Sequence, residues 1–458
     1  MSWLKYDGSD GIDIIFPSGN KRHKGDDTLV PFKTKGDKSE YIDFSGVIGA
    51  FSRILNETSI RRNLTMEEIK NSLRNRVETQ NDDEFEKLFE IVKSLYFRNG
   101  KLVLSSVKTL AFIESNTTQR QVAEYLYSLF IDDTDIKEKY QKLEKTEDVN
   151  ALERFIFEAF EDNQLEEMKE FAKARCHLPY VRQVFIEDFR VLLENIDFYK
   201  SNIQKLLSYY YMFYVTQLAI KLRKFEKADR NSLEKIFLSL SWEGISKVRP
   251  GYEYGWKYVL ESLSQMFSHS VVLQMISHNV EKKHYDYIEI YEKFNGSAED
   301  EKVATEIKEL NNRYKNWIPM NYDQCKYSKV RSSCKTSNEI CRLFETVDYQ
   351  FINGSRRSHY NAYNKMFIEF VQKNFGKRRG TLGYTLGVDE NYIIMFTQII
   401  LRANKGKIKM SFLYDEFERR GLLFDRESRK KIAELLEKMN LLEKRSDSGD
   451  TQYVKSIL

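Results

Sequence analysis

Apolar residues recur at helical spacing along most of the chain. Residues three, four and seven positions apart share one face of a helix, so this spacing predicts amphipathic helices. The clearest examples are Phe85–Tyr96, Leu152–Phe160 and Val259–Phe267. The pattern predicts about ten helices between Ile48 and Phe375, joined by short polar connectors.

The most apolar stretch, Leu206–Ile220, is bounded by Lys205 and Lys221. An α-helix needs about 20 residues to cross a bilayer, and this stretch is shorter. Its tyrosine, serine, threonine and glutamine side chains suit a buried helix whose polar groups find hydrogen-bond partners. We therefore expect a helix at the centre of a protein core.

The first 45 residues are polar and are interrupted by glycine and proline. Two short apolar runs, Ile12–Phe16 and Thr28–Phe32, lie between turn-forming residues, which predicts short strands or an ordered arm. The N-terminus lacks the apolar segment that forms the core of a signal peptide. With 4 Cys in 458 residues a disulfide framework is excluded, and 30 Phe and 28 Tyr exclude a largely disordered chain. A cytoplasmic location is expected.

Two polar stretches that contain glycine mark expected boundaries, at Asn295–Glu301 and Gly376–Gly383. The expected parts are an N-terminal arm with short strands (1–45), a helical body (46–295), a basic helical segment (296–383) and a winged-helix domain (384–458). The predicted fold class is therefore mainly α, with a multi-helical body, a short β-containing N-terminal arm and a C-terminal winged helix.

The first elements expected in the winged-helix domain are two helices and a strand between them. The apolar face of Tyr392–Ile400 predicts a first helix, and Lys407–Met410 alternates like a short strand. Phe412–Arg420 predicts a second helix, which Gly421 ends because glycine readily adopts the left-handed conformation found there.

A third helix and a hairpin complete the order of elements. Asp425 is a favourable N-cap for a helix that ends near Asn440. Two alternating segments, Leu441–Arg445 and Gln452–Ile457, then flank a turn-forming loop. Helix, strand, helix, helix and hairpin is the order found in winged helices.

In a winged helix that binds DNA, the third helix enters the major groove and the hairpin contacts the backbone. The contacts predicted here are Arg426, Arg429, Lys430, Lys444 and Arg445. Glu434 and Glu437 make the second half of the third helix acidic, which opposes binding to phosphates. Because winged helices also dock proteins, DNA binding and partner docking both remain open.

Charge is distributed unevenly although the formal net charge is only +4. Residues 132–171 hold 14 acidic and 6 basic side chains, a net of −8. Residues 321–380 hold 12 basic and 5 acidic side chains, a net of +7. The total therefore gives no argument for nucleic-acid binding, whereas the basic region is a candidate.

Aromatic residues are interleaved with the basic ones in this region. The basic side chains are Lys326, Lys329, Arg331, Lys335, Arg356 and Arg357, and the aromatic ones are Tyr327, Tyr349, Phe351 and Tyr360. Such a mixture is typical of surfaces that follow a nucleic-acid backbone and stack on its bases. The alternative is a positive surface that meets an acidic partner or the acidic segment of the same chain.

Motifs for enzymatic chemistry are missing from the sequence. The stretch Gly376-Lys-Arg-Arg-Gly380 lacks the Lys-Ser/Thr pair of a phosphate-binding loop. It predicts a basic loop, either solvated or in contact with phosphate through Lys377, Arg378 and Arg379. We recognise no grouping of carboxylates typical of metal-dependent nucleases, although such residues can be dispersed along a chain.

Cysteine and histidine spacing does not favour a metal site. Cys325, Cys334 and Cys341 are separated by more residues than the two to four usual between paired zinc ligands. His269, His278 and His284 show no consistent helical i, i+4 spacing. We predict ordinary thiols and structural or surface histidines, with no cofactor, no metal and no assignable catalytic residue.

Four segments resemble the DptG family of bacterial phosphorothioation-dependent DNA restriction systems. The C-terminal run Leu441-Leu-Glu-Lys-Arg-Ser-Asp-Ser-Gly-Asp-Thr-Gln-Tyr-Val-Lys-Ser-Ile-Leu458 is the most specific. The others are Glu416-Phe-Glu-Arg-Arg-Gly-Leu-Leu-Phe-Asp-Arg-Glu-Ser428, Leu178-Pro-Tyr-Val-Arg182 and Tyr209-Tyr-Tyr-Met-Phe-Tyr214. The resemblance implies an accessory subunit that works with two partner subunits carrying ATPase-type motifs. Such a system attacks DNA that lacks a phosphorothioate mark.

The resulting expectation is a non-catalytic component that associates with double-stranded DNA and bridges subunits of an antiphage restriction complex. Whether the chain is itself an enzyme stays open, although an accessory role is favoured. The alternative is a metal-dependent nuclease subunit with dispersed carboxylates. A third hypothesis, a winged-helix transcription regulator, is disfavoured because the long preceding region carries no sensor signature.

Overall fold

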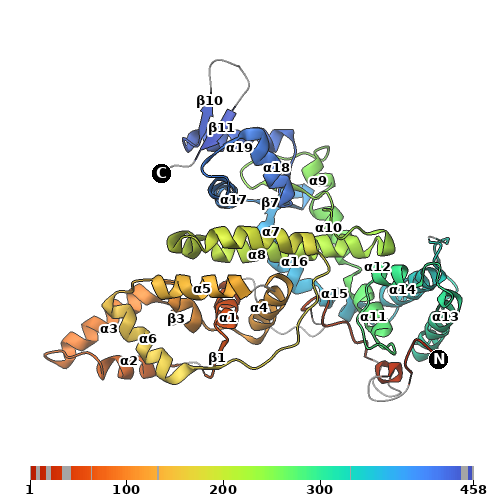
Figure 1. The fold of residues 1–458 in the computed structure, drawn as a ribbon, viewed down its shortest axis with the longest axis horizontal. Helices are drawn as coiled ribbons and strands as arrows, with labels where there is room; N and C mark the ends of the chain where they lie inside the picture. Colours follow the sequence, from red (N-terminus) through yellow and green to blue (C-terminus); the bar gives the residue numbers. More distant parts are fainter. Residues whose placement is uncertain are drawn as a thin grey trace. The chain divides into compact units, whose positions relative to one another are not determined.

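A computed structural model describes residues 2–6, 11–16, 22–32, 43–62, 64–131, 134–330, 332–444 and 452–455. The described chain is mainly α-helical, with a few small sheets (Figure 1). The fold class predicted from the periodicity is confirmed at this level.

Helices dominate the chain up to residue 222. The α-helices are α1 Ser45–Leu55, α2 Met66–Arg74, α3 Asp82–Tyr96, α4 Thr117–Phe130, α5 Thr134–Thr146, α6 Ala151–Gln164, α7 Pro179–Leu192 and α8 Ile196–Leu222. The short elements are η1 Ile12–Ile15, β1 Thr58–Ile60, β2 Phe97–Arg98, β3 Lys101–Leu102, η2 Lys108–Phe112 and β4 Leu165–Glu167. Several helices begin at a side-chain cap, including α2, where Thr65 and Glu68 form a capping box.

Shorter helices and more strands follow. The helices are η3 Phe225–Lys227, α9 Pro250–Glu253, α10 Trp256–Leu263, α11 Met266–Ser277, α12 Tyr287–Phe294, α13 Asp300–Trp317, α14 Lys335–Asn353, α15 Arg357–Tyr363, α16 Lys365–Phe375, η4 Gly380–Leu382, α17 Glu390–Ala403, α18 Met410–Arg419 and α19 Arg426–Lys438. The strands are β5 Phe237–Leu240, β6 Gly376–Arg378, β7 Tyr384–Val388, β8 Lys407–Lys409, β9 Leu423–Phe424, β10 Leu442–Lys444 and β11 Gln452–Lys455.

The helices are more numerous than predicted because some apolar faces are interrupted. The face expected over Val259–Phe267 is divided between α10 and α11, with Ser264 as the C-cap of α10. Both helices bury this face, since Val259, Leu263, Met266 and Phe267 are each at most 3% exposed. Periodicity therefore identified the buried residues but not the break between the helices.

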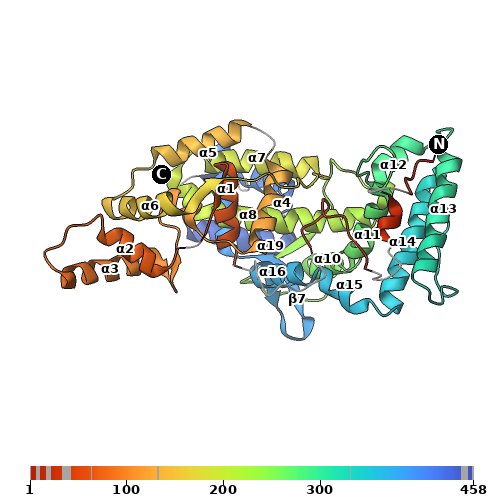
Figure 2. The same cartoon turned by 90° about the horizontal axis from the view of Figure 1, so that it is seen from below.

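The chain forms two compact units, each built from separate stretches. The first unit comprises residues 1–36, 214–239 and 244–387, and the second comprises residues 37–213, 240–243 and 388–458. In the first unit α13 and α14 pack along each other, and α14 also contacts α11 (Figure 2). In the second unit α1 packs on α4, and α7 contacts both α4 and α17.

The apolar stretch Leu206–Ile220 lies within α8, and its four tyrosines are fully buried. The prediction of a buried core helix is confirmed. Among the described helices none has the length and apolar character needed to cross a membrane.

In the part of the N-terminal segment that the structure describes, the two apolar runs form an ordered arm, one of the two expected alternatives, and not strands. Ile12–Ile15 is a 3₁₀ helix, and Thr28–Phe32 contains a turn but no regular strand. The expectation of strands is wrong here because these apolar side chains pack on helices: Phe32 contacts the rings of Tyr363 and Phe367. Ile12, Leu29 and Val30 are nearly fully buried, which explains their apolar character without a sheet.

Over the residues that the structure describes, the C-terminal segment from residue 388 has the helices and strands predicted for it and one further short strand, β9. Asp425 caps α19 by accepting a hydrogen bond from the Ser428 backbone N–H, and Gly421 follows α18 with φ +78°. Strands β10, β11 and β8 form an antiparallel sheet in that order, with Val454 paired to both Leu442 and Ile408. The loop between β10 and β11 lies outside the described residues.

Candidate nucleic-acid interface and a buried polar network

Helix α19 presents two of its three predicted basic contacts to solvent. Ile432, Leu435 and Leu436 are buried, which fixes the opposite face outward. Arg426 and Lys430 are exposed, and Lys430 Nζ lies 3.0 Å from Glu427 Oε1. An exposed ion pair of this kind contributes little and exchanges readily for a phosphate contact.

Arg429 instead holds the segment together. Its Nε donates to the Phe424 carbonyl at 3.1 Å, and its guanidinium forms an ion pair with Glu418. The guanidinium carbon also lies 5.0 Å from the centroid of the Tyr414 ring. These contacts connect α19 to α18, so Arg429 belongs to the packing of the segment rather than to its free surface.

The sheet carries a basic patch that the sequence reasoning only partly identified. Alternation along β8 places Lys407 and Lys409 on the exposed face while Ile408 is buried. Lys455 of β11 is paired with Lys407 and is also exposed. Lys407 Nζ lies 5.0 Å from the centroid of the Tyr453 ring, so this face combines cations with an aromatic ring. The alternating Lys-Ile-Lys was the signal that could have revealed it.

Of the predicted hairpin contacts, Lys444 lies in β10 opposite Gln452. Arg445 lies outside the described residues. The structure therefore describes the two strands of this hairpin and not the loop between them.

The predicted basic loop, residues 376–380, lies in a β-hairpin. Strand β6 pairs with β7 in antiparallel register, and β7 in turn neighbours β5. Lys377 and Arg378 are exposed on β6. Arg379 is half-buried, and it donates to Thr385 Oγ1 at 3.2 Å and to Ser239 Oγ at 3.4 Å. Two of the three basic side chains are therefore free to face a ligand, and the third supports the hairpin.

The basic and aromatic mixture in 321–380 is less continuous in space than in sequence. Arg357 is exposed and Arg356 is half-buried at the start of α15. Phe351 and Tyr360 stack on each other with centroids 5.2 Å apart, and both are buried. They belong to the core and are not placed to stack on bases, because α14 and α15 turn them toward each other.

The structure divides the predicted basic contacts between the two units. Arg356, Arg357 and Lys377–Arg379 belong to the first unit, whereas Arg426, Arg429, Lys430 and Lys444 belong to the second. Each group is therefore a separate candidate surface.

The cysteines of the first unit are buried thiols. Cys334 caps α14 by accepting from the Ser337 backbone N–H, and its thiol donates to Asp300 Oδ1 at 3.3 Å. Burial raises the pKa values of Cys325 and Cys334, which keeps both thiols protonated. Within the described residues, no three His, Cys, Asp or Glu side chains come together in a way that could hold a metal ion.

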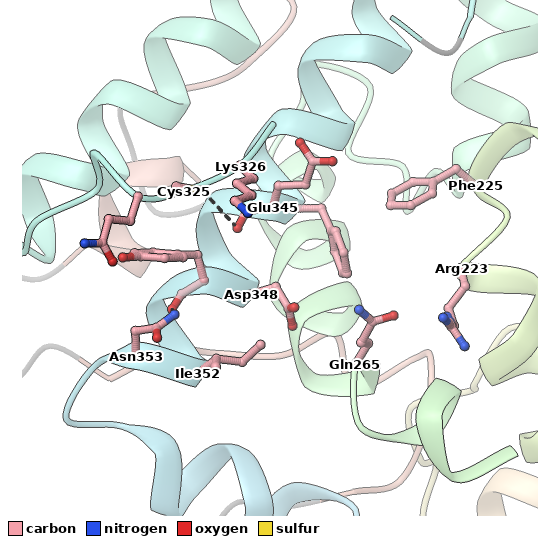
Figure 3. Close-up of a pocket in the computed structure, with 12 residues that line it drawn as sticks. Arg223, Phe225, Gln265, Cys325, Lys326, Glu345, Asp348, Ile352 and Asn353 are labelled. Carbon is pink, nitrogen blue, oxygen red and sulfur yellow. Dashed lines mark hydrogen bonds between the residues drawn. The ribbon is translucent and has the colours of Figure 1, made fainter. Parts of the chain in front are cut away.

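A cavity of about 440 Å³ lies in the first unit (Figure 3). Its lining includes Arg223, Cys325, Glu345 and Asp348. Asp348 accepts hydrogen bonds from Ser268 and Tyr360, while burial raises its pKa. The cavity thus presents a protonated thiol and a hydrogen-bonded carboxyl group, neither of which is an activated nucleophile.

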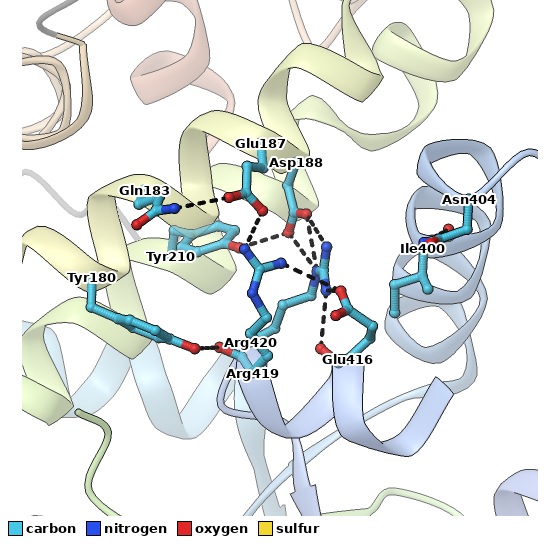
Figure 4. Close-up of polar contacts among 10 residues, drawn as sticks. All are labelled: Tyr180, Gln183, Glu187, Asp188, Tyr210, Ile400, Asn404, Glu416, Arg419 and Arg420. Atoms are coloured by element: carbon cyan, nitrogen blue, oxygen red, sulfur yellow. Dashed lines mark hydrogen bonds and ion pairs between the residues drawn. The ribbon is translucent and has the colours of Figure 1, made fainter. Parts of the chain in front are cut away.

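A buried ion pair is the most elaborate polar feature of the second unit (Figure 4). Arg420 Nη2 lies 2.7 Å from Asp188 Oδ1, and these side chains are 3% and 1% exposed. Arg420 also donates to Glu416 Oε2 at 2.6 Å, and the Tyr210 hydroxyl donates to Asp188 Oδ2 at 2.6 Å. Burial lowers the pKa of Arg420, but the charge of Asp188 and the hydrogen bonds to Asp188 and Glu416 together outweigh this effect and leave the pKa above its ordinary value.

Further contacts connect the same network to the backbone. The Tyr209 hydroxyl donates to the Arg420 carbonyl at 2.7 Å, and the Tyr180 hydroxyl donates to the Arg419 carbonyl at 3.2 Å. Arg419 forms an ion pair with Glu187 (Figure 4). The network therefore joins α7 and α8 to the end of α18.

The network brings together three sequence segments that are far apart in the chain. Leu178–Arg182 supplies Tyr180, Tyr209–Tyr214 supplies two hydroxyl groups, and Glu416–Ser428 supplies Glu416, Arg419 and Arg420. In the sequence these segments are noticed only because they resemble a family. That resemblance does not reveal that they meet in the structure. Adjacent arginines directly before a helix-ending glycine were the available signal.

No model of a known protein family matches the chain, and no curated protein matches it either. Evidence for a function therefore comes from the residues and contacts of the chain itself.

Proposed function

We propose that the C-terminal segment is a winged helix that contacts double-stranded DNA. The order α17, β8, α18, α19, β10 and β11, together with the antiparallel sheet β10-β11-β8, supports this proposal. In such an arrangement α19 is the helix that enters the major groove. Arg426 and Lys430 then reach phosphates, and the lysines of β8 and β11 lie beside the backbone.

The observation that carries the proposal is the outward basic face of a well-anchored helix. Asp425 caps α19, three buried side chains fix its rotation, and Arg429 ties it to α18. A rigidly held helix with exposed cations binds phosphates at low entropic cost. The acidic second half of α19 limits the contact to its first turns.

We further propose that the chain acts without catalysing a reaction, as a component that associates with DNA and bridges subunits of a phosphorothioation-dependent restriction complex. The resemblance to the DptG family supports this context. The partners it implies are two ATPase-type subunits of the same system, which attack DNA lacking the phosphorothioate mark. Phe412 on α18 is a large apolar side chain that is 38% exposed, and we propose it as a contact for a protein partner.

The DNA contact is tested by charge reversal on α19. The double variant Arg426→Glu with Lys430→Glu should weaken binding of an unmodified DNA duplex by at least about tenfold at moderate salt, because two phosphate contacts become repulsive. The slope of log K against log salt should become shallower by about 1 to 2. Fluorescence anisotropy of the full-length chain over a series of salt concentrations measures both quantities.

The matched control is Lys142→Glu with Lys145→Glu on α5. It makes the same change in net charge at exposed positions of the same unit. Equal loss of affinity in both double variants would indicate a nonspecific effect of charge and would remove α19 from the proposal.

Subunit bridging is tested by co-purification with the two ATPase-type subunits. Phe412→Ser should reduce co-purification and leave duplex binding by the isolated chain unchanged. The α19 variant should weaken duplex binding and leave co-purification unchanged. If the α19 variant abolishes co-purification and leaves DNA affinity intact, the segment is a protein-docking module. Nicking of unmodified plasmid that follows the purified chain in the presence of Mg²⁺ would contradict the non-catalytic role.

A further inference from the structure

A second cavity, of about 520 Å³, lies wholly within the second unit. Its walls come from α1, β1, α4 and the chain at 166–171. This volume is within the range of small-molecule sites. The proposed function does not use this cavity.

The most unusual group in its lining is Arg53 of α1, which is 6% exposed. Its Nη1 donates to the carbonyl groups of Ala111 and Ile113, and its Nη2 donates to Ser115 Oγ at 2.6 Å. These bonds use three of the five donors of a guanidinium. In the part of the chain that the structure describes, Nε–H and one N–H of Nη2 have no hydrogen-bond partner; we call these two donors the free edge of Arg53, and such an edge of a guanidinium can bind a phosphate or carboxylate in bidentate fashion.

Among the described residues, no carboxylate forms an ion pair with Arg53. Burial, followed by the positive charge of Arg120, lowers the pKa of Arg53 to about 10, so the side chain stays charged at neutral pH. A buried charge normally has a partner of opposite sign. The charged neighbour of Arg53 is Arg120, which is also a cation. We therefore expect an anion to bind beside Arg53 and supply the missing opposite charge.

The rest of the cavity has the same preference. Arg61, Arg62, Arg120 and Lys169 also line it, and with Arg53 and three glutamates the lining holds five positive and three negative charges, a net of +2, although Arg62 is paired with Glu68 outside the lining. The hydroxyl of Thr58, another lining residue, is buried without a hydrogen-bond partner among the described residues. An unpartnered buried hydroxyl is uncommon in proteins and is a second indication of a ligand.

We propose that this cavity binds a phosphomonoester of about mononucleotide size. A phosphomonoester carries a charge of about −1.5 to −2 at neutral pH, which matches the net charge of the lining. The free edge of Arg53 and the side chains of Arg61 and Arg120 bind the phosphate. The apolar side chains of Ile60 and Phe171 form a wall for the organic part.

Binding is tested by calorimetry of the full-length chain with inorganic phosphate, adenosine 5′-monophosphate and adenosine. The monophosphate should bind more tightly than inorganic phosphate, since it also contacts the apolar wall, and adenosine should bind at least about tenfold more weakly. The natural ligand could be a free nucleotide or the 5′ end of a nucleic-acid strand, and a dinucleotide with a 5′-phosphate distinguishes the two. If it binds as tightly as adenosine 5′-monophosphate, the ligand is the end of a strand. If it does not bind, the ligand is a free nucleotide.

The variant Arg61→Gln with Arg120→Gln should weaken binding of the monophosphate by about tenfold or more, because it removes two charge-assisted contacts. Both side chains are exposed, so folding is not at risk. Arg154→Gln, at an exposed position on α6, is the matched control and should bind as the wild type does. Arg53→Lys keeps the buried charge and should lose the bidentate contact.

Three results would overturn the proposal. These are no binding of phosphate or monophosphate at millimolar concentration, equal affinity for adenosine and its monophosphate, and an equal loss in Arg154→Gln and in the double variant. Duplex binding through α19 is measured separately, so failure of either proposal leaves the other intact.

Discussion

His269 lies inside the first unit between aromatic rings. Its ring stacks on Phe344 with centroids 4.2 Å apart, and its Nδ1 lies 3.0 Å from the Tyr287 hydroxyl. Burial, followed by the charge of Arg223, lowers the pKa of His269 to about 3. The ring is therefore neutral in the folded protein over most of the acidic range.

The pH dependence of stability follows from this shift. Below a pH of about 6.5 the unfolded chain takes up a proton on His269 and the folded chain does not, so stability falls as the pH decreases toward 3. His269 should account for a loss of about 2 kcal/mol at pH 5 relative to pH 8. Urea unfolding as a function of pH measures this effect, and His269→Phe should show a slope smaller by about one proton.

His359 offers the control, since it is exposed on α15. His359→Gln should keep the pH dependence of the wild type. A wild-type slope in His269→Phe would show that another group causes the acid sensitivity.

At the scale of elements, Gly421 controls how α18 leads into α19. Its φ of +78° favours glycine, and an added Cβ would collide with the Phe213 ring of α8. Gly421→Ala should therefore cost about 1 kcal/mol from backbone strain and a further about 1 to 3 kcal/mol from overpacking. Chemical unfolding monitored by circular dichroism measures the loss.

Gly100 is the matched control for backbone strain alone. It has φ +74° in the same unit, and an added Cβ there meets no atom within 4 Å. Gly100→Ala should lose only about 1 kcal/mol. Similar losses in both variants would contradict the close packing of Gly421 against Phe213.

Elements with local signals could be predicted from the sequence. Asp425 and Gly421 determine the ends of α19 and α18 through hydrogen bonding and backbone conformation, both of which are local. The choice between strands and an ordered arm at Thr28–Phe32 stayed open because the partners of this segment, such as Tyr363, are distant in the chain. The hairpin β6–β7 was expected as a loop. Phe351 and Tyr360 illustrate the same limit, since burial depends on which helices meet.

The candidate site was predictable only in part for the same reason. Arg426 and Lys430 follow from the helical rotation that Ile432 sets. The inward role of Arg429 depends on Glu418 and Tyr414, which a single helix does not reveal. Arg53 and its cavity were missed entirely, because an arginine within an apolar helix gives no sign of what surrounds it.

At the scale of the whole molecule, the chain returns to each unit after long excursions. Residues 388–458 pack with residues 37–213, for example through Phe396 and Tyr209, whose rings are 4.8 Å apart. Expressed alone, residues 388–458 would expose this apolar contact and the charge of Arg420.

We therefore expect the isolated fragment 388–458 to be poorly folded. Its amide NMR spectrum should have low dispersion, and co-expression with residues 37–243 should restore a folded complex, because that fragment supplies the missing contacts. A well-dispersed spectrum of the fragment alone would show that the segment is an independent domain.

The ion pair between Asp188 and Arg420 also constrains how this protein can diverge. Loss of either partner leaves the other charge buried and costs about 3 to 5 kcal/mol, whereas joint replacement by apolar residues leaves neither of these two charges buried alone and costs less. Single changes at these positions should therefore be rare among descendants of this sequence. Positions 188 and 420 should instead vary together, so that an inherited pair of changes far apart in the chain records a single contact.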